Sequence, residues 1–220
     1  MAKTYDVEAL MDQQKLTILK LPVDDWFKGD VLVSSRRYDY VVVQNGKVLG
    51  TVKGNNTPLT KKSFPALKTS LFSQKLKGVT VWCVTKILTL GQHVGRRLRF
   101  IFEYPALKNC LGNDVRVSWS SMATLKVADY QDWYDKMIQA NEVEVYYEES
   151  MDKVTQSFLD KAIREAVSKN VKDPNVTYLC VYGIQSEKSK EFYEAVEKIV
   201  TQRFRALGYT YVMTLPEYFL

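Results

Sequence analysis

The only histidine, His93, is the residue on which most catalytic chemistry in this chain would depend. A Ser-His-Asp triad or a Cys-His pair uses a histidine as general base, and many metal sites take several histidines. His93 lies within residues 90–95, a glycine-bounded stretch that reads as a turn between strands and carries no recognisable nucleophile motif. We therefore expect a solvent-exposed turn residue, and a multi-histidine metal site is excluded.

The three cysteines, Cys83, Cys110 and Cys180, are odd in number and far apart, and no C-x-x-C pair exists. This spacing argues against a zinc ribbon or a redox dithiol and favours free thiols that are buried as small apolar side chains. The sequence also contains no G-x-G-x-x-G motif, and no Gly-Lys-Ser/Thr follows the glycines at positions 50 and 54. Such glycine-rich loops cradle phosphates, so nucleotide binding is not indicated and no cofactor is expected.

Paired carboxylates occur at Glu142 and Glu144 and at Glu148 and Glu149. Acid–base catalysis would need two such groups opposed in a desolvated cleft. The stretch around them is polar, which favours a solvated acidic surface. The sequence therefore predicts no catalytic, cofactor-binding or metal-binding residue, and a protein that is not an enzyme.

Positive charge is concentrated in one part of the chain. Residues 30–110 hold 14 Lys and Arg but 3 Asp and Glu, a formal charge of +11, whereas residues 111–220 carry −4 and residues 1–29 carry −1. With so few acids between them, the basic clusters should create a positive surface that binds an anionic partner. We predict that this basic patch consists of Arg36, Arg37, Lys61, Lys62, Lys75, Lys77, Arg96, Arg97 and Arg99.

Three kinds of partner could answer the basic patch. An anionic membrane would gain roughly 1 kcal/mol for each basic residue near its surface, and nucleic acid would gain by counterion release. Tyr38, Tyr40 and Phe100 are interleaved with the charges, as in base-stacking platforms, although aromatic residues on strands more often belong to the core. The third partner is another subunit, whose acidic surface would consist of Asp129, Asp132, Asp135, Glu142, Glu144, Glu148 and Glu149. No small-molecule substrate is indicated.

The basic residues are expected to lie on a β-rich half of the chain, residues 30–127. Asn45-Gly46 between two β-branched runs, residues 38–43 and 48–52, predicts a hairpin, because a type I′ turn needs positive φ at both central residues. Residues 79–84 are apolar at both parities, which indicates a central strand covered on two faces. Residues 115–127 alternate with a period of two and predict one long strand, paired with residues 97–103.

The period then changes to that of helices. Asp129 can cap a helix over residues 129–138, and two further amphipathic helices are predicted, one from about residue 152 and one from residue 186 to Gly208. Residues 142–149 read as a loop or a short edge strand, residues 176–183 are a weak strand candidate, and residues 208–215 predict a strand that returns to the sheet edge. The fold class expected is α+β, with a β-rich N-terminal half in an antiparallel or mixed sheet, then three amphipathic helices and a returning C-terminal strand.

The predicted domain organisation is an N-terminal extension over residues 1–29 and a single domain over residues 30–220, β-rich to residue 127, helical over residues 128–207 and closed by the final strand. The hydrophobic share of 46% and the charged share of 25% are ordinary for a globular protein. No apolar run approaches the roughly 18 residues of a membrane span, and the first residues carry acids where a signal peptide needs an apolar stretch. We expect a cytoplasmic protein.

The order and spacing of these elements resemble the stomatin–prohibitin–flotillin (SPFH) superfamily, especially its soluble, virion-core-like branch. The resemblance covers roughly residues 30–215 and includes the N-G-K hairpin, a G…L-T loop with a following proline, and the V-x-D step that opens a helix. The positions that carry it are Asn45, Gly46, Lys47, Gly54, Leu59, Thr60, Pro65, Val127 and Asp129. It implies a scaffold that has no active site and builds rings or arrays through lateral contacts. A membrane anchor and a long coiled coil, which many relatives have, are not found in this sequence.

Two functional hypotheses follow. The first is a non-enzymatic, self-assembling structural protein of SPFH type, in which the basic β half of one subunit contacts the acidic helical half of the next. Such a homo-oligomer would lie at an anionic membrane or form part of a phage or viral particle, in the host cytoplasm in that case. The alternative is a nucleic-acid-binding module that uses the basic surface of residues 30–110.

Overall fold

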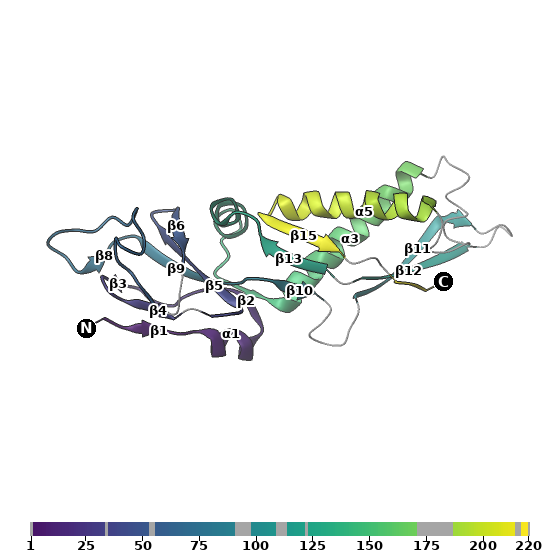
Figure 1. Ribbon diagram of the computed structural model, residues 1–220. Helices are drawn as coiled ribbons and strands as arrows, with labels where there is room; N and C mark the ends of the chain where they lie inside the picture. The colour runs from purple at the N-terminus through teal and green to yellow at the C-terminus, as the bar shows by residue number, and fades with distance from the viewer. Residues whose placement is uncertain are drawn as a thin grey trace. The chain divides into compact units, whose positions relative to one another are not determined.

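The chain divides into two compact units in the computed structural model, which describes residues 2–33, 35–52, 56–90, 98–108, 114–121, 123–170, 187–213 and 217–219 (Figure 1). Unit 1 comprises Met1–Leu88 and Lys126–Met151, and unit 2 comprises Thr89–Leu125 and Asp152–Leu220. Helices occur together with antiparallel and mixed sheets, so the predicted α+β class is confirmed.

A five-stranded antiparallel sheet in the order β14-β2-β9-β5-β6 forms the centre of unit 1. Its strands are β2 (Leu16–Lys20), β5 (Tyr38–Gln44), β6 (Lys47–Thr51), β9 (Val79–Thr85) and β14 (Val145–Tyr147). β9 lies in the middle and is buried at both parities, which confirms the predicted central strand. β14 is an edge strand, one of the two alternatives predicted for residues 142–149.

The hairpin predicted at Asn45-Gly46 joins β5 to β6. Asn45 has φ 51° and Gly46 has φ 78°, so both central residues adopt the left-handed conformation that a type I′ turn requires. Gly78, which immediately precedes β9, lies against this turn: its carbonyl accepts a hydrogen bond from the Asn45 N–H at 2.9 Å. A Cβ at Gly78 would lie 1.9 Å from Asn45 Oδ1, so only glycine fits there.

The N-terminal residues are built into unit 1. Helix α1 (Glu8–Gln14) and strands β1 (Thr4–Tyr5), β2 and β3 (Trp26–Phe27) all precede residue 30. β1 pairs with β4 (Val31–Val33), which also pairs with β7 (Asn56–Pro58), and β3 pairs with β8 (Lys75–Leu76). The predicted extension over residues 1–29 is therefore part of the framework, because β2 fills the place between β14 and β9 in the central sheet.

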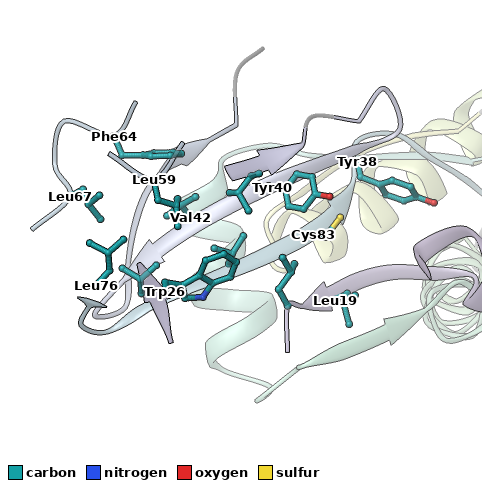
Figure 2. Packing of buried hydrophobic residues seen from close by; sticks show 14 of the residues in the cluster. Leu19, Trp26, Tyr38, Tyr40, Val42, Leu59, Phe64, Leu67, Leu76 and Cys83 are labelled. Carbon is teal, nitrogen blue, oxygen red and sulfur yellow. The ribbon is translucent and has the colours of Figure 1, made fainter. Parts of the chain in front are cut away.

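The core of unit 1 packs one face of the central sheet against the segments that precede β9. Figure 2 shows Phe64, Leu67 and Leu76 gathered at one end of this cluster and Tyr38 at the other. Trp26 lies close to Leu76, its partner in the β3–β8 pair. Burial of these large side chains stabilises the unit and attaches the segment between β7 and β8 to its core.

Unit 2 contains helices α3 (Glu148–Asn170, from Asp152 onward) and α5 (Glu187–Arg205) and most of two three-stranded sheets. One sheet has the order β10-β13-β15 and the other β11-β12-β16. The strands are β10 (Leu88–Leu90), β11 (Leu98–Lys108), β12 (Asp114–Ser121), β13 (Ala123–Val127), β15 (Tyr209–Met213) and β16 (Glu217–Phe219). Phe204 of α5 stacks on Tyr211 of β15 with ring centroids 5.0 Å apart, and Gly208, at φ 81°, separates the two elements as predicted.

Helical segments occur near the three predicted positions, but the first is an α-helix over only part of its length. Asp129 caps α2 (Tyr130–Trp133) by accepting a hydrogen bond from the Asp132 N–H at 2.9 Å, and α2 continues directly as the π-helix η1 (Tyr134–Gln139). α3 begins at Glu148, four residues before the predicted start. The weak strand candidate at residues 176–183 lies outside the described residues.

The single long strand predicted over residues 115–127 is wrong. β12 and β13 belong to different sheets, and β12 pairs with β11 through contacts such as Phe100 with Trp119. That pairing confirms the partnership predicted between residues 97–103 and the strand after them. A period of two in the sequence does not distinguish one long strand from two strands in different sheets.

The helices that the structure describes include none with the length and apolar character needed to cross a bilayer.

Candidate functional site

Residues 58–78, here called the lysine-rich segment, carry five lysines and no Asp or Glu. All five lysine side chains are exposed to solvent: Lys61, Lys62, Lys68, Lys75 and Lys77. The segment leads from β7 through a long loop into β8 and the start of β9 (Figure 1). It is therefore the strongest local concentration of positive charge within unit 1 that the structure describes.

The first half of the segment is anchored by its apolar residues. A turn closes where the Phe64 N–H donates to the Thr60 carbonyl at 2.9 Å, and the Leu67 N–H donates to the Phe64 carbonyl at 2.9 Å. Leu59, Phe64 and Leu67 are all buried in the core cluster. Lys61 and Lys62 are held on this anchored turn, with their side chains in solvent.

Gln44, the last residue of β5, clamps the two ends of the loop that follows. Its side-chain oxygen accepts a hydrogen bond from the Lys68 N–H at 2.8 Å. Its side-chain nitrogen donates to the carbonyls of Lys68 and Lys77, both at 3.0 Å. The amide is buried, so these bonds form away from water and bring the backbones of Lys68 and Lys77 together.

The loop between the clamped ends is also structured by Lys28 and Ser70. Lys28 Nζ donates to the Ser70 carbonyl at 2.5 Å, and the Lys28 N–H donates to the Gln74 carbonyl at 2.8 Å. Ser70 Oγ accepts from the Phe72 N–H at 3.1 Å, a local bond that tightens the bend. The β3–β8 pair then closes the loop at its far end.

At the bend, Leu71 and Phe72 point away from the protein. The exposed fractions of their side chains are 94% for Leu71 and 98% for Phe72, the two highest among the described large apolar residues. We call this pair the apolar tip. The chain therefore exposes an aliphatic and an aromatic residue in succession on a braced loop, with lysines on both sides in the sequence.

The structure brings some predicted basic residues together and separates others. The backbones of Lys68 and Lys77 come together at the base of the loop, and Lys75 forms an ion pair with Asp25. Arg37 precedes β5 and pairs with Asp12 at 2.7 Å, so it lies at the opposite end of the strand from Gln44, roughly 24 Å away for seven extended residues. Arg36 lies beside it in the chain. The predicted patch is therefore divided within unit 1.

One of the predicted basic residues is described in the second unit. Arg99 lies on β11, which is part of unit 2, whereas Arg96 and Arg97 fall outside the described residues.

The predicted acidic surface is largely engaged within its own chain. Besides the cap at Asp129, Asp132 pairs with Lys136 at 2.7 Å, and Asp135 accepts a hydrogen bond from Gln131 at 2.9 Å. Glu144 pairs with Lys20 at 2.5 Å.

Glu148 and Glu149 occupy the first turn of α3, where the helix macrodipole favours acidic side chains. Glu142 is exposed and has φ 50°.

Two of the described side chains that could take part in chemistry, a cysteine and a tyrosine, have raised pKa values. Cys83 is buried on β9, and burial raises the pKa of its thiol, so it stays protonated at neutral pH. Burial and a hydrogen bond to Asp39 raise the pKa of the Tyr130 phenol. No group of three His, Cys, Asp or Glu side chains suited to a metal ion occurs in the described ranges. His93, Cys110 and Cys180 lie outside them.

Comparison with known proteins gives no relative: no protein-family model matches the sequence, and no curated protein is significantly similar to it. The resemblance to the SPFH superfamily therefore stays a prediction.

Sequence reasoning missed the residues that give the segment its shape. Lys28, Gln44 and Lys68 carry no motif, and their roles depend on contacts across 24 to 42 positions of the chain. The apolar tip left no clear signal. Leu71 and Phe72 stand in a polar run, Thr-Ser before and Ser-Gln after, but Leu67 and Leu76 lie four positions from Leu71 and Phe72 respectively, which is the spacing of an apolar helix face.

Proposed function

We propose that this protein is a non-enzymatic binding scaffold that attaches to an anionic partner through the lysine-rich segment of unit 1. The observation that carries the proposal is the clamped loop itself: Gln44 gathers Lys68 and Lys77 at one place on a rigid sheet, with no carboxylate anywhere in residues 58–78. A preformed cluster of this kind binds without first having to order a flexible chain, which lowers the entropic cost.

The expected binding is electrostatic at long range. Lys61, Lys62, Lys68 and Lys77 carry the positive charge, because the charge of Lys75 is offset by Asp25. Each lysine near an anionic surface contributes roughly 1 kcal/mol. Attraction between exposed charges is screened over about 8 Å at physiological ionic strength, so binding should weaken as salt rises.

A non-enzymatic role is supported by the way reactive groups are used. The Cys83 thiol is buried and protonated, and four of the seven predicted acidic residues serve as a cap or as partners of neighbouring side chains. The cytoplasmic location expected from the sequence belongs to the same proposal, since anionic lipids are concentrated on the cytoplasmic leaflet.

Self-assembly through contacts between the basic and acidic surfaces stays a prediction, and so does membership of the SPFH superfamily. The intrachain bonds of Asp132, Asp135 and Glu144 leave fewer free carboxylates for a neighbouring subunit than the sequence suggested. The nucleic-acid alternative, which uses the basic surface of residues 30–110, also stays a prediction.

Heparin affinity chromatography tests the proposal with a generic polyanion as the probe. We compare the protein with the variant Lys61→Gln/Lys62→Gln/Lys68→Gln/Lys77→Gln. A control variant, Lys126→Gln/Lys153→Gln/Lys161→Gln/Lys198→Gln, removes the same charge from exposed lysines elsewhere. We expect the first variant to elute at a clearly lower NaCl concentration than the control. Equal elution of the two variants would refute the proposal, because net charge alone would then explain retention.

A further inference from the structure

We propose that the anionic partner is a lipid bilayer and that Leu71 and Phe72 insert into its interface. This inference rests on the proposed function and deepens it by naming the class of partner. It starts from exposure: the side chains of Leu71 and Phe72 are 94% and 98% exposed, whereas the other exposed large apolar residues among those described reach 59% at most. Two adjacent, almost fully exposed apolar side chains gain from any partner that removes them from water.

The loop holds the apolar tip outward by contacts that do not involve the side chains of the tip. Gln44 fixes Lys68 and Lys77, Lys28 holds the Ser70 carbonyl, and Ser70 Oγ holds the Phe72 N–H. The side chains of Leu71 and Phe72 therefore remain free to enter another phase. A braced loop also loses little conformational freedom when it inserts, so more of the gain from burial appears as affinity.

The surrounding charges suit the headgroups of an anionic bilayer. Lys68 lies three residues before Leu71, and Lys75 and Lys77 lie three and five residues after Phe72. Asp25, a carboxylate that contacts the segment, is already paired with Lys75. When the tip enters the interface, these lysines would lie at headgroup level, with their alkyl chains toward the apolar layer and their ammonium groups toward phosphate.

Other anionic partners fit the apolar tip less well. A nucleic acid could neutralise the lysines and stack a base on Phe72, but the aliphatic Leu71 has no ring for stacking. A protein partner needs on the order of 1,000 Å² of buried surface for a stable interface, far more than two side chains supply. A bilayer accepts a small apolar wedge and offers negative charge around it.

Vesicle co-sedimentation tests the inference on the full chain. The probes are phosphatidylcholine vesicles with and without phosphatidylserine. The test variant is Leu71→Ser/Phe72→Ser, and the matched control is Ile87→Ser/Val212→Ser, which changes two other exposed apolar residues. Because all four side chains are exposed, each variant should keep the fold, which circular dichroism checks.

We expect the protein to bind the vesicles that contain phosphatidylserine and to bind pure phosphatidylcholine much more weakly. The tip variant should lose at least tenfold in vesicle affinity, since burying one such side chain contributes about tenfold or more to partitioning. The control variant should bind like the unmodified protein. The variant Phe72→Trp gives a direct readout of insertion. Brominated lipid should quench its tryptophan fluorescence to a greater extent than it quenches the fluorescence of the unmodified protein.

The outcomes separate this inference from the function on which it rests. Retention on heparin that depends on the four lysines, together with no loss of vesicle binding in the tip variant, would overturn insertion and leave the proposed function standing. Equal losses in the tip and control variants would also overturn it, because the effect would not be specific to the loop. No lysine-dependent retention on heparin and no vesicle binding would refute both.

Discussion

Replacement of Gln44 by alanine tests whether one buried amide holds the loop of the lysine-rich segment in place. The side chain makes three hydrogen bonds, at 2.8, 3.0 and 3.0 Å, to the backbone of Lys68 and Lys77. Alanine removes all three and leaves one N–H and two carbonyls without their partner. We expect the variant to fold with a lower free energy of unfolding and a loosened loop.

The magnitude follows from the hydrogen bonds. A typical buried hydrogen bond contributes about 1 kcal/mol net, and a buried group left without a partner costs about 1–3 kcal/mol. Since water can reach some of the freed groups when the loop loosens, the free energy of unfolding should fall by about 2–4 kcal/mol. Gln131 offers a matched control. It also makes three hydrogen bonds, to Val48, Gly46 and Asp135, but it is only partly buried.

Urea denaturation and amide hydrogen exchange measure the two parts of this expectation. Gln131→Ala should lower the free energy of unfolding by about 1 kcal/mol or less, because water can take over the hydrogen bonds of a partly exposed amide. In Gln44→Ala the Lys68 amide, which donates to Gln44 Oε1, should exchange much faster than in the unmodified protein. Equal stability losses in the two glutamine variants, or unchanged exchange at Lys68, would refute the clamp.

Two further predictions concern buried polar groups of unit 1. Asp30 is fully buried, and its carboxylate accepts hydrogen bonds from the N–H groups of Lys3 at 2.8 Å and Phe27 at 2.9 Å. Asp30→Ala should therefore lower the free energy of unfolding by about 3–5 kcal/mol in urea denaturation, and Asp30→Asn by about half as much; a loss below 1 kcal/mol would contradict this reasoning. Burial raises the pKa of Tyr40 to about 12, whereas the value in an unfolded chain is near 10. The phenol therefore loses its proton first in the unfolded state, and the free energy of unfolding should fall as the pH rises from 10 to 12. The slope is about 1.4 kcal/mol per pH unit for this phenol, and Tyr40→Phe should show a shallower decline in urea titrations at pH 9.5, 10.5 and 11.5; identical slopes would count against Tyr40 as a contributor.

Local chemistry made several elements predictable. Asn45-Gly46 fixes its hairpin because few other residue pairs tolerate positive φ at both positions. β9 could be recognised because a strand covered on both faces must be apolar at every position. Asp129 could be recognised as a cap because its carboxylate satisfies a helix N–H that lies three residues away.

Other features could not be predicted, because the same sequence pattern is compatible with two different structures. The alternation over residues 115–127 is the same whether the chain continues in one sheet or passes from β12 to β13 in another. The basic patch was inferred from net charge along the chain. Folding then placed Arg37 at one end of β5 and the Gln44 clamp at the other.

The sequence alone determined the α+β class, the sign and location of the excess charge, and the turns and caps whose residues interact with near neighbours. Tertiary structure alone decided which lysines lie together and that Leu71 and Phe72 face solvent, although an apolar pair in a chain would ordinarily be assigned to the core. The physical reason is that side-chain burial and charge clustering depend on contacts between residues far apart in the chain, such as Gln44 with Lys77. Local propensity does not encode those contacts.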